Sequence, residues 1–367
     1  MQTRLRWYFI VPALILIGLF VWFFKNLIIY FIIAAIVSLM GRPIIKLFRR
    51  IRVKNLQFPD ALSALLTLLF IYGLALSFFL LMIPLVIQQA ESISNINEEI
   101  VTSSMRDPIE SLDEFAHTHG LLEKNESIRT YLQDKLRSVV SFTRLSNLAN
   151  NIIGFTGDFF IAVFSISFIA FFFLKDPKML HSIIISMIPA NYEERAEKVL
   201  TGVKTLLTRY FIGVVIEVLL VGGLIATGLS ILGVKNALMI GFFAGLFNVI
   251  PYVGPLIGAG LGMTLTALGS LNGLSLDFYS QMIPLMLKVG VVFLIVQLID
   301  NFVFQPFIYS SSVKAHPLEI FLIILMAGSI AGVGGMILAI PVYTIFRVMA
   351  KEFFNQFKLV QSITKGI

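Results

Sequence analysis

Cysteine is absent from all 367 residues, and charged residues are scarce. Without thiols the chain cannot form disulfides, thiolate metal sites or a cysteine nucleophile. Asp, Glu, Lys and Arg make up 13% of the residues, which is about half their share in a soluble domain. The only neighbouring histidines, His117 and His119, are two residues apart, so they would lie on different faces of a helix. These shortages argue against an ordinary soluble protein and against a metal site.

Common catalytic and nucleotide-binding patterns are also missing. The chain contains no Walker A pattern, no H-E-x-x-H and no G-x-S-x-G. We therefore predict that it is not an enzyme, that it uses no cofactor, and that any active transport is secondary or depends on a partner. The net charge of +7 does not indicate nucleic acid, because the basic residues fall in short loops beside apolar segments. Such residues orient membrane helices.

Apolar residues dominate instead. They account for 57% of the chain, and the mean hydropathy is +0.91. Several apolar runs exceed the length of about 18 residues that indicates a transmembrane helix. The sequence therefore predicts an all-α, polytopic membrane protein in a lipid bilayer. The expected single spans are residues 7–24 and 27–40, which would form a helical hairpin across Lys25-Asn26, then 61–87, 152–174, 211–232 and 283–304.

Two further segments, 237–268 and 317–349, are longer than one span requires. A straight helix of that length would reach roughly 48 Å, whereas the hydrocarbon core is about 30 Å thick. The first is interrupted between Pro251 and Pro255, and the second between Gly332 and Gly335. Each is therefore either one long kinked helix or a re-entrant pair of half-helices. The chain would have about 8 transmembrane segments in the first case, or 6 plus two re-entrant hairpins in the second. We expect both segments to behave alike, with their breaks facing one another.

The distribution of charge predicts the orientation of the chain. The connector after residue 40 has the highest density of basic residues and should be cytoplasmic, like both termini. Segment 90–150 carries ten acidic and six basic residues, with apolar residues at helical spacing. It should form a small helical extracytoplasmic domain between transmembrane helices 1–3 (residues 1–89) and a C-terminal transmembrane domain (residues 151–367). The amphipathic stretch 192–209 is expected to lie in the cytoplasmic interface or to serve as a solvated connector.

The break in segment 237–268 is the first candidate site. Pro251 and Pro255 donate no backbone hydrogen bond, so carbonyl groups are freed there. At membrane depth such groups are tolerated only against protein or a water-filled cavity, and transporters place substrate and ion sites at broken helices. We therefore expect the following residues to line a substrate site or pathway: Asn248, Pro251, Tyr252, Gly254, Pro255, Gln297, Asn301, Gln305, Gly332, Gly334 and Gly335.

Two carboxylates inside spans are the second candidate. Ionisable side chains are costly in a membrane and usually face the interior of the helix bundle. Glu217 lies in the span 211–232, and Asp300 lies deep in the run that follows residue 283. Gln297, Asp300 and Asn301 should share one helix face because they are three and four residues apart. We predict that Asp300 and Glu217 couple transport to a proton or an ion. The alternative is that these polar groups hold helices together by hydrogen bonds.

Four motifs in the C-terminal half resemble those of one known family. They are Asn248-Val-Ile-Pro-Tyr-Val-Gly-Pro255, Asp300-Asn301 with Gln305-Pro306, His316-Pro317-Leu318 and Gly334-Gly335-Met-Ile-Leu-Ala-Ile-Pro341. In this order they resemble the autoinducer-2 exporter (AI-2E) family, and the resemblance covers essentially the whole chain. It implies a permease of the bacterial inner membrane. Some members export the quorum-sensing furanone precursor, and others are sodium/proton antiporters. The resemblance also implies a homo-oligomer, such as a pentamer.

The leading hypothesis is therefore a secondary transporter of a small polar solute, by resemblance autoinducer-2 or another metabolite, coupled to a proton or cation gradient. A monovalent cation/proton antiporter is the first alternative. A membrane scaffold that does not transport is the second, and there the acidic segment 90–150 would bind a partner. A passive channel is the third, and it would show neither saturation nor coupling.

Overall fold

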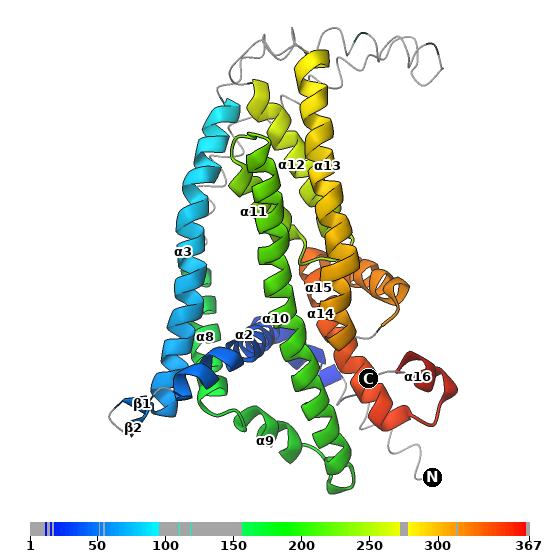
Figure 1. Ribbon diagram of the computed structural model, residues 1–367. Coiled ribbons are helices and arrows are strands. Elements are labelled where there is room, and N and C mark those ends of the chain that lie inside the picture. The colour runs from blue at the N-terminus through cyan, green and yellow to red at the C-terminus, as the bar shows by residue number, and fades with distance from the viewer. Residues whose placement is uncertain are drawn as a thin grey trace. The chain divides into compact units, whose positions relative to one another are not determined.

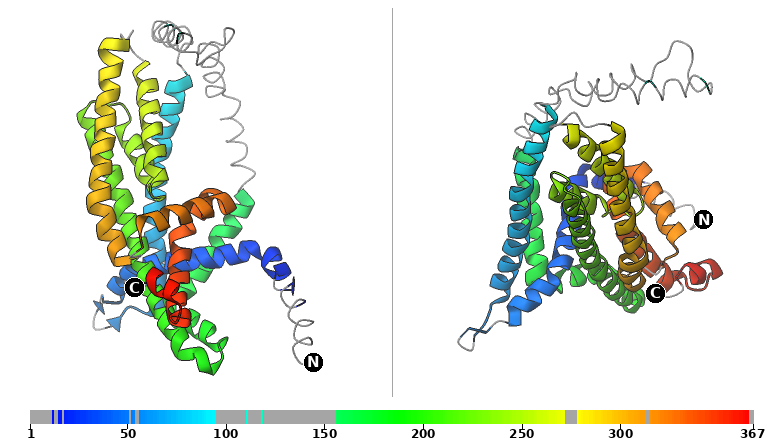
Figure 2. Two further views of the ribbon diagram at one scale, coloured as in Figure 1. Left: turned by 90° about the vertical axis from the view of Figure 1, so that its right-hand side faces the viewer. Right: turned by 45° about the horizontal axis from the view of Figure 1, so that its top comes forward.

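The computed structural model describes residues 18–50, 52–53, 56–94, 156–271, 278–312 and 315–364, with single residues at 12, 15, 16, 110 and 118 (Figure 1 and Figure 2). Most of the predicted extracytoplasmic domain, 90–150, lies outside these residues. The elements are α2 (Lys25–Arg50), β1 (Arg52–Val53), β2 (Leu56–Gln57), α3 (Asp60–Ser94), α8 (Thr156–Lys175), α9 (Met179–Ser186), η1 (Ala190–Tyr192), α10 (Glu193–Ile231), α11 (Ala237–Phe247), α12 (Val253–Leu271), η2 (Phe278–Met282), α13 (Ile283–Ile299), η3 (Asp300–Phe304), α14 (Gln305–Ser312), α15 (Pro317–Phe354) and α16 (Lys358–Ile363).

The regular structure is helical apart from the β1–β2 ribbon, an antiparallel pair in which Arg52 lies opposite Gln57. Six helices in the described residues are long and apolar enough to cross a membrane, and the bent pair of α8 and α9 would make a seventh span. This confirms a polytopic helical membrane protein. The helices form two compact units. The first comprises the described residues of Met1–Leu74 and Ile152–Lys204, and the second those of Ala75–Asn151 and Thr205–Ile367.

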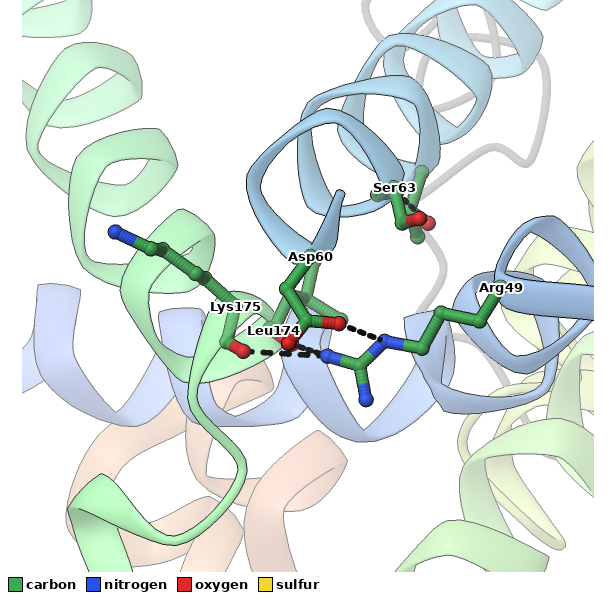
Figure 3. Close-up of polar contacts among 6 residues, drawn as sticks. Arg49, Asp60, Ser63, Leu174 and Lys175 are labelled. Carbon is green, nitrogen blue, oxygen red and sulfur yellow. Dashed lines mark hydrogen bonds and ion pairs between the residues drawn. The ribbon is translucent and has the colours of Figure 1, made fainter. Parts of the chain in front are cut away.

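The first unit is held together by small residues and by one arginine. Ala34, Ala64 and Ala170, from α2, α3 and α8, are fully buried in its core, so these helices approach closely. Figure 3 shows Arg49, near the end of α2, reaching the start of α3 and the end of α8. Its Nε contacts Asp60 Oδ1 at 3.0 Å, and its Nη2 donates to the carbonyls of Leu174 (3.3 Å) and Lys175 (3.2 Å). The carbonyls at the end of α8, which have no partner within the helix, thus gain a cationic donor.

Two predicted boundaries are wrong. Residues 18–23 are helical, and helical hydrogen bonds from Phe24 N to Phe20 O (2.9 Å) and from Ile28 N to Phe24 O (3.0 Å) continue into α2. Lys25 and Asn26 are therefore part of a helix and do not form a hairpin connector. The amphipathic stretch 192–209 is not a separate helix either. From Glu193 on it forms the first part of α10, a helix of 39 residues that is about 58 Å long, because the stretch contains no proline and its one glycine, Gly202, remains helical.

The first long segment folds back on itself. α11 and α12 run side by side in opposite directions (Figure 1). A Cβ atom built on Gly258 would lie 3.0 Å from Ala244 Cα, and one on Gly262 would lie 2.9 Å from Ile240 Cγ2. Glycine at both positions therefore allows the two helices to pack closely. With 11 residues, α11 is about 16 Å long, roughly half the thickness of a hydrocarbon core. Segment 237–268 is therefore a pair of helices and not one long kinked helix, and α12, with 19 residues, is by itself long enough to cross a membrane.

The second long segment, α15, also forms a helical hairpin. Its helical dihedral angles are broken at Ala331 (φ −132°, ψ 19°) and Gly332 (φ 59°, ψ −145°), and the latter conformation is essentially restricted to glycine. The Tyr343 hydroxyl donates to Glu319 Oε2 at 2.7 Å. Along a straight helix these two residues would be about 36 Å apart. Their contact therefore requires the two arms of α15 to lie side by side. At the start of the first arm, His316 Nδ1 caps the helix by accepting from Leu318 N at 3.2 Å.

Cross-linking tests the α15 hairpin directly, because the chain has no native cysteine. Glu319→Cys combined with Tyr343→Cys should be joined by a short bifunctional maleimide, and the linked peptides should be found by mass spectrometry. A control pair combines Glu319→Cys with Phe354→Cys, about three turns beyond Tyr343. A straight helix would leave both pairs unlinked, and that result would contradict the hairpin.

Candidate coupling and transport site

The break between α11 and α12 begins where Pro251 cannot donate a backbone hydrogen bond. Before it, the last turn tightens, with Val249 N bonded to Leu246 O (3.3 Å) and Ile250 N to Phe247 O (3.0 Å). Tyr252 then adopts a left-handed conformation (φ 66°), which is uncommon for a residue other than glycine. The chain reverses there, and α12 starts at Val253. The reversal leaves Asn248 as the C-cap of α11, with its side chain directed into the second unit.

A π-helical turn places the other half of the site. In η3 the N–H of Gln305 bonds to the carbonyl of Asp300, five residues back. Pro306 follows, and its missing N–H removes the regular bond to the carbonyl of Phe302. Such wide turns are rare and often occur at functional sites. Here the π turn brings Gln305 back toward Asp300, and Gln305 Nε2 donates to Asp300 Oδ2 at 2.8 Å.

These local features assemble a buried polar cluster from four elements of the second unit: Glu217 on α10, Asn248 at the end of α11, Asp300 on η3 and Gln305 on α14. Glu217, Asn248 and Asp300 are 2%, 3% and 0% exposed. Asn248 Nδ2 lies 3.3 Å from Glu217 Oε1 and 3.4 Å from Asp300 Oδ2. Glu217 is also within hydrogen-bonding reach of Asp300. We call these four residues the carboxylate cluster.

The cluster has more acceptors than donors. The carboxyl groups of Glu217 and Asp300 share the amide of Asn248. If both were ionised in this buried site, they would repel each other. In the part of the chain that the structure describes, Asn248 Oδ1 and Asp300 Oδ1 are buried and have no hydrogen-bond partner. A proton held between the carboxyl groups, or a cation among these oxygens, would remove the imbalance.

The structure separates the other predicted site residues from this cluster. Gln297 Nε2 donates to Asn301 Oδ1 at 2.9 Å, and this pair is partly exposed, whereas Asp300 is fully buried. Gln297, Asp300 and Asn301 were predicted to share one helix face, but Asp300 points into the core and the other two do not. Gly332 and Gly334 lie at an exposed tip, where an added Cβ would meet nothing within 4 Å.

The neighbourhood of the first break also differs from the expectation. The ring of Tyr252 packs edge-on against Phe321, with ring centroids 5.9 Å apart. Phe321 is near the start of α15, so the first break contacts the base of the α15 hairpin, and the expectation that it faces the break at Gly332 is not met. Pro251 is buried, and Pro255 lies half-buried in the first turn of α12.

Sequence reasoning missed Tyr210. It is buried on α10 two turns before Glu217, near enough for a charge on Glu217 to act on its hydroxyl group. A tyrosine in an apolar run gives no signal by itself, but the seven-residue spacing from Glu217 indicates a common helix face.

Among the described residues, no group of three or more His, Asp or Glu side chains could hold a metal ion.

Comparison with known proteins identifies the family. Residues 10–355 match the sequence profile of the AI-2E family transporter. The chain belongs to the AI-2E transporter family. It is 26% identical over 350 residues to "Putative transport protein YueF" of Bacillus subtilis (strain 168), covering 93% of this chain and 88% of that one. Identity to "Putative transport protein MJ1177" of Methanocaldococcus jannaschii is 23% over 335 residues, or 89% of each chain. "Putative permease PerM" of Escherichia coli (strain K12) is 25% identical over 179 residues, 48% of this chain and 47% of that one.

All four residues of the carboxylate cluster lie within the matched region. Membership of the AI-2E family agrees with the helical membrane fold and indicates a transporter. Transporters bind substrates and ions where helices are discontinuous, so the two hairpins and the carboxylate cluster are candidates for such a site.

Proposed function

We propose that this AI-2E transporter is a secondary transporter that couples the movement of a small polar solute to a proton through the carboxylate cluster. The observation that carries the proposal is the pair of buried carboxyl groups, Glu217 and Asp300, that share the amide of Asn248. One proton on this pair relieves the repulsion between them, and its release would favour a different arrangement of the helices. α10, α11, η3 and α14 all contribute, so protonation acts on four elements at once.

The two hairpins are the proposed moving parts. Hydrogen bonds at the break between α11 and α12 position Asn248, so displacement of that hairpin would separate it from Glu217 and Asp300. The solute would bind beside the break, at the backbone carbonyls freed near Pro251 and at polar side chains facing them. Candidate solutes are autoinducer-2 and other small polar metabolites, and the proposed location is a bacterial inner membrane with both termini cytoplasmic. A homo-oligomer such as a pentamer is part of this proposal.

Flux into proteoliposomes tests the proposal. The purified chain is reconstituted with an imposed pH gradient, and small polar solutes and monovalent cations are screened for uptake that saturates and that moves the internal pH. A passive channel would conduct without either property. Deletion of Ser92–Asn147 separates the scaffold alternative, because a transporter core should retain flux without that segment.

Exchange of a monovalent cation for protons is a second candidate, favoured by two specific observations. Asn248 Oδ1 and Asp300 Oδ1 are buried oxygens without hydrogen-bond partners among the described residues, and oxygen atoms are the usual ligands of alkali cations. Asn248 is also the C-cap of α11. The C-terminal end of a helix carries partial negative charge and favours cations. Protonation of the cluster would then compete with cation binding.

A stability measurement distinguishes the two candidates. If Na⁺, K⁺ or Li⁺ binds the folded chain at the cluster, the cation should stabilise the folded state by about 2.7 kcal/mol when its concentration is a hundred times the dissociation constant. We expect this cation-dependent rise in melting temperature for the wild type in detergent at constant ionic strength. It should be absent in Asp300→Asn and present in Glu194→Gln, which makes the same chemical change at an exposed position. An equal rise in all three proteins would contradict cation binding at the cluster.

A further inference from the structure

α9 leaves the end of α8 at a sharp angle. The two helices are bent by 92° across a short break (Figure 1), which contains Pro177. α8 is an apolar helix of 20 residues and is about 30 Å long, which suits a membrane span. Transmembrane helices are tilted by about 20° on average from the bilayer normal. A helix bent by about a right angle from α8 therefore runs close to the plane of the membrane.

The surface of α9 is divided into three sectors. On one side, Leu180 packs against the core of the first unit. On another, the exposed hydroxyl-bearing residues Ser182 and Ser186 offer polar groups to water. Between these sectors, Met179, Ile183 and Met187 follow one another at four-residue spacing and are 38%, 42% and 79% exposed. An apolar stripe beside a polar one is the pattern of a helix that lies in the membrane interface.

Basic side chains stand at the same end of the unit. Lys175 and Lys178 flank the bend and are exposed, while Asp176 Oδ1 accepts a hydrogen bond from Lys178 N at 3.0 Å. Arg49 binds the last carbonyls of α8, which brings the end of α2 close to this bend (Figure 3). Lys46 and Arg50, exposed at that end of α2, thereby add to the positive charge. Clustered lysines and arginines next to a span attract anionic lipid headgroups.

We propose that α9 is an interfacial helix that binds the surface of an anionic membrane. The stripe of Met179, Ile183 and Met187 enters the boundary between headgroups and acyl chains, and Lys175 and Lys178 contact lipid phosphates. Ser182 and Ser186 face water. This surface lies in the first unit and takes no part in the carboxylate cluster, so the proposal is independent of the proposed transport function. The lipid contact would anchor the turn between α8 and α10 at a constant depth.

Site-directed spin labelling of the full chain tests the inference, since every introduced cysteine is unique. Nitroxides are placed at Ile183→Cys and Met187→Cys, and at Ser182→Cys and Ser186→Cys as matched positions on the same helix. The protein is reconstituted in vesicles of phosphatidylcholine and phosphatidylglycerol. Power saturation measures how accessible each nitroxide is to oxygen, which concentrates in the bilayer, and to a water-soluble nickel complex. The labels at residues 183 and 187 should be more accessible to oxygen, and those at residues 182 and 186 should be more accessible to the nickel complex.

Two other results would overturn the proposal. Equal access of the nickel complex to all four labels would place α9 in water. Exclusion of both reagents from Ile183 and Met187 would show that protein, such as a second copy of the chain, covers the stripe.

The headgroup preference is tested with a fluorophore at Met187→Cys and quencher-labelled lipids. Quencher-labelled phosphatidylglycerol should reduce the fluorescence at least twice as strongly as quencher-labelled phosphatidylcholine. This preference should disappear when Lys175→Gln and Lys178→Gln are combined. Equal quenching by both lipids in the otherwise unchanged chain would refute binding to anionic headgroups.

Discussion

Asp300→Asn is expected to reduce pH-gradient-driven flux to the level of protein-free liposomes. The asparagine side chain has the size of aspartate and can still accept the hydrogen bond from Gln305, but it cannot ionise. Asp300 is fully buried and lies next to Glu217 and Asn248, so a change there alters the protonation chemistry of the whole cluster. The loss of stability should stay within about 1–2 kcal/mol, since one polar group replaces another. A transport defect in a folded protein therefore assigns the residue to coupling.

The measurement uses a pH-sensitive dye inside the vesicles together with uptake of whichever solute or cation the wild type transports. Glu194→Gln serves as the control, because it makes the same carboxylate-to-amide change at an exposed position, and it should retain full flux. Wild-type flux in Asp300→Asn would remove this residue from the coupling role. Glu217→Gln should also lose coupling, and the double variant should be no worse than either single one, since the two carboxyl groups act on one proton.

Gly254→Ala is expected to destabilise the folded chain by about 3 kcal/mol or more. A Cβ atom on Gly254 would overlap the carbonyl oxygen of Phe247, and it would also lie 2.9 Å from Asn248 N. Both neighbours are backbone atoms, which cannot rotate away like the end of a flexible side chain. The methyl group must therefore push α11 and α12 apart at their connection. Because that connection positions Asn248, flux should fall together with stability.

Gly260→Ala is the matched control on the same helix. Nothing lies within 4 Å of a Cβ atom at Gly260, and alanine favours a helix over glycine by about 0.5–1 kcal/mol. Its melting temperature in detergent should therefore equal or exceed that of the wild type. The comparison is made by following the loss of monodisperse protein during heating. If the two variants melted at the same temperature, the close approach of Gly254 to the end of α11 would be refuted.

Several features of this protein could be inferred from residues alone because they depend on local chemistry. Long apolar runs with few charges require a membrane, whatever the fold. Pro251 and Gly332 favour a helix break, because one lacks an N–H and the other allows a conformation closed to other residues, although Pro43, Pro84 and Pro341 lie inside helices. A carboxylate such as Asp300 in an apolar run must be buried against polar partners. The breaks and the two carboxylates were therefore predictable as separate features.

Helix continuity was predicted less well, because it depends on weak local preferences. Lys25 and Asn26 looked like a connector, yet both can take part in a helix, and backbone hydrogen bonds continue through Phe24. The stretch 192–209 is amphipathic, but nothing in it ends a helix, so it continues into the next span as α10. The period of apolar residues indicates which face is buried and does not indicate where a helix ends.

Sequence by itself determined that this protein is helical, membrane-embedded and broken at two places, because each property follows from residues close together in the chain. Only the tertiary structure decided that α15 folds back to join Glu319 to Tyr343, and that Glu217 meets Asn248 and Asp300. Those contacts link residues 24 to 52 positions apart, and they depend on how hairpins and the π turn direct each side chain. A one-residue change in helical register, such as η3 introduces, rotates a face by about 100°. That rotation brings Gln305 back toward Asp300, to which it donates a hydrogen bond, and spacing along the chain could not reveal it.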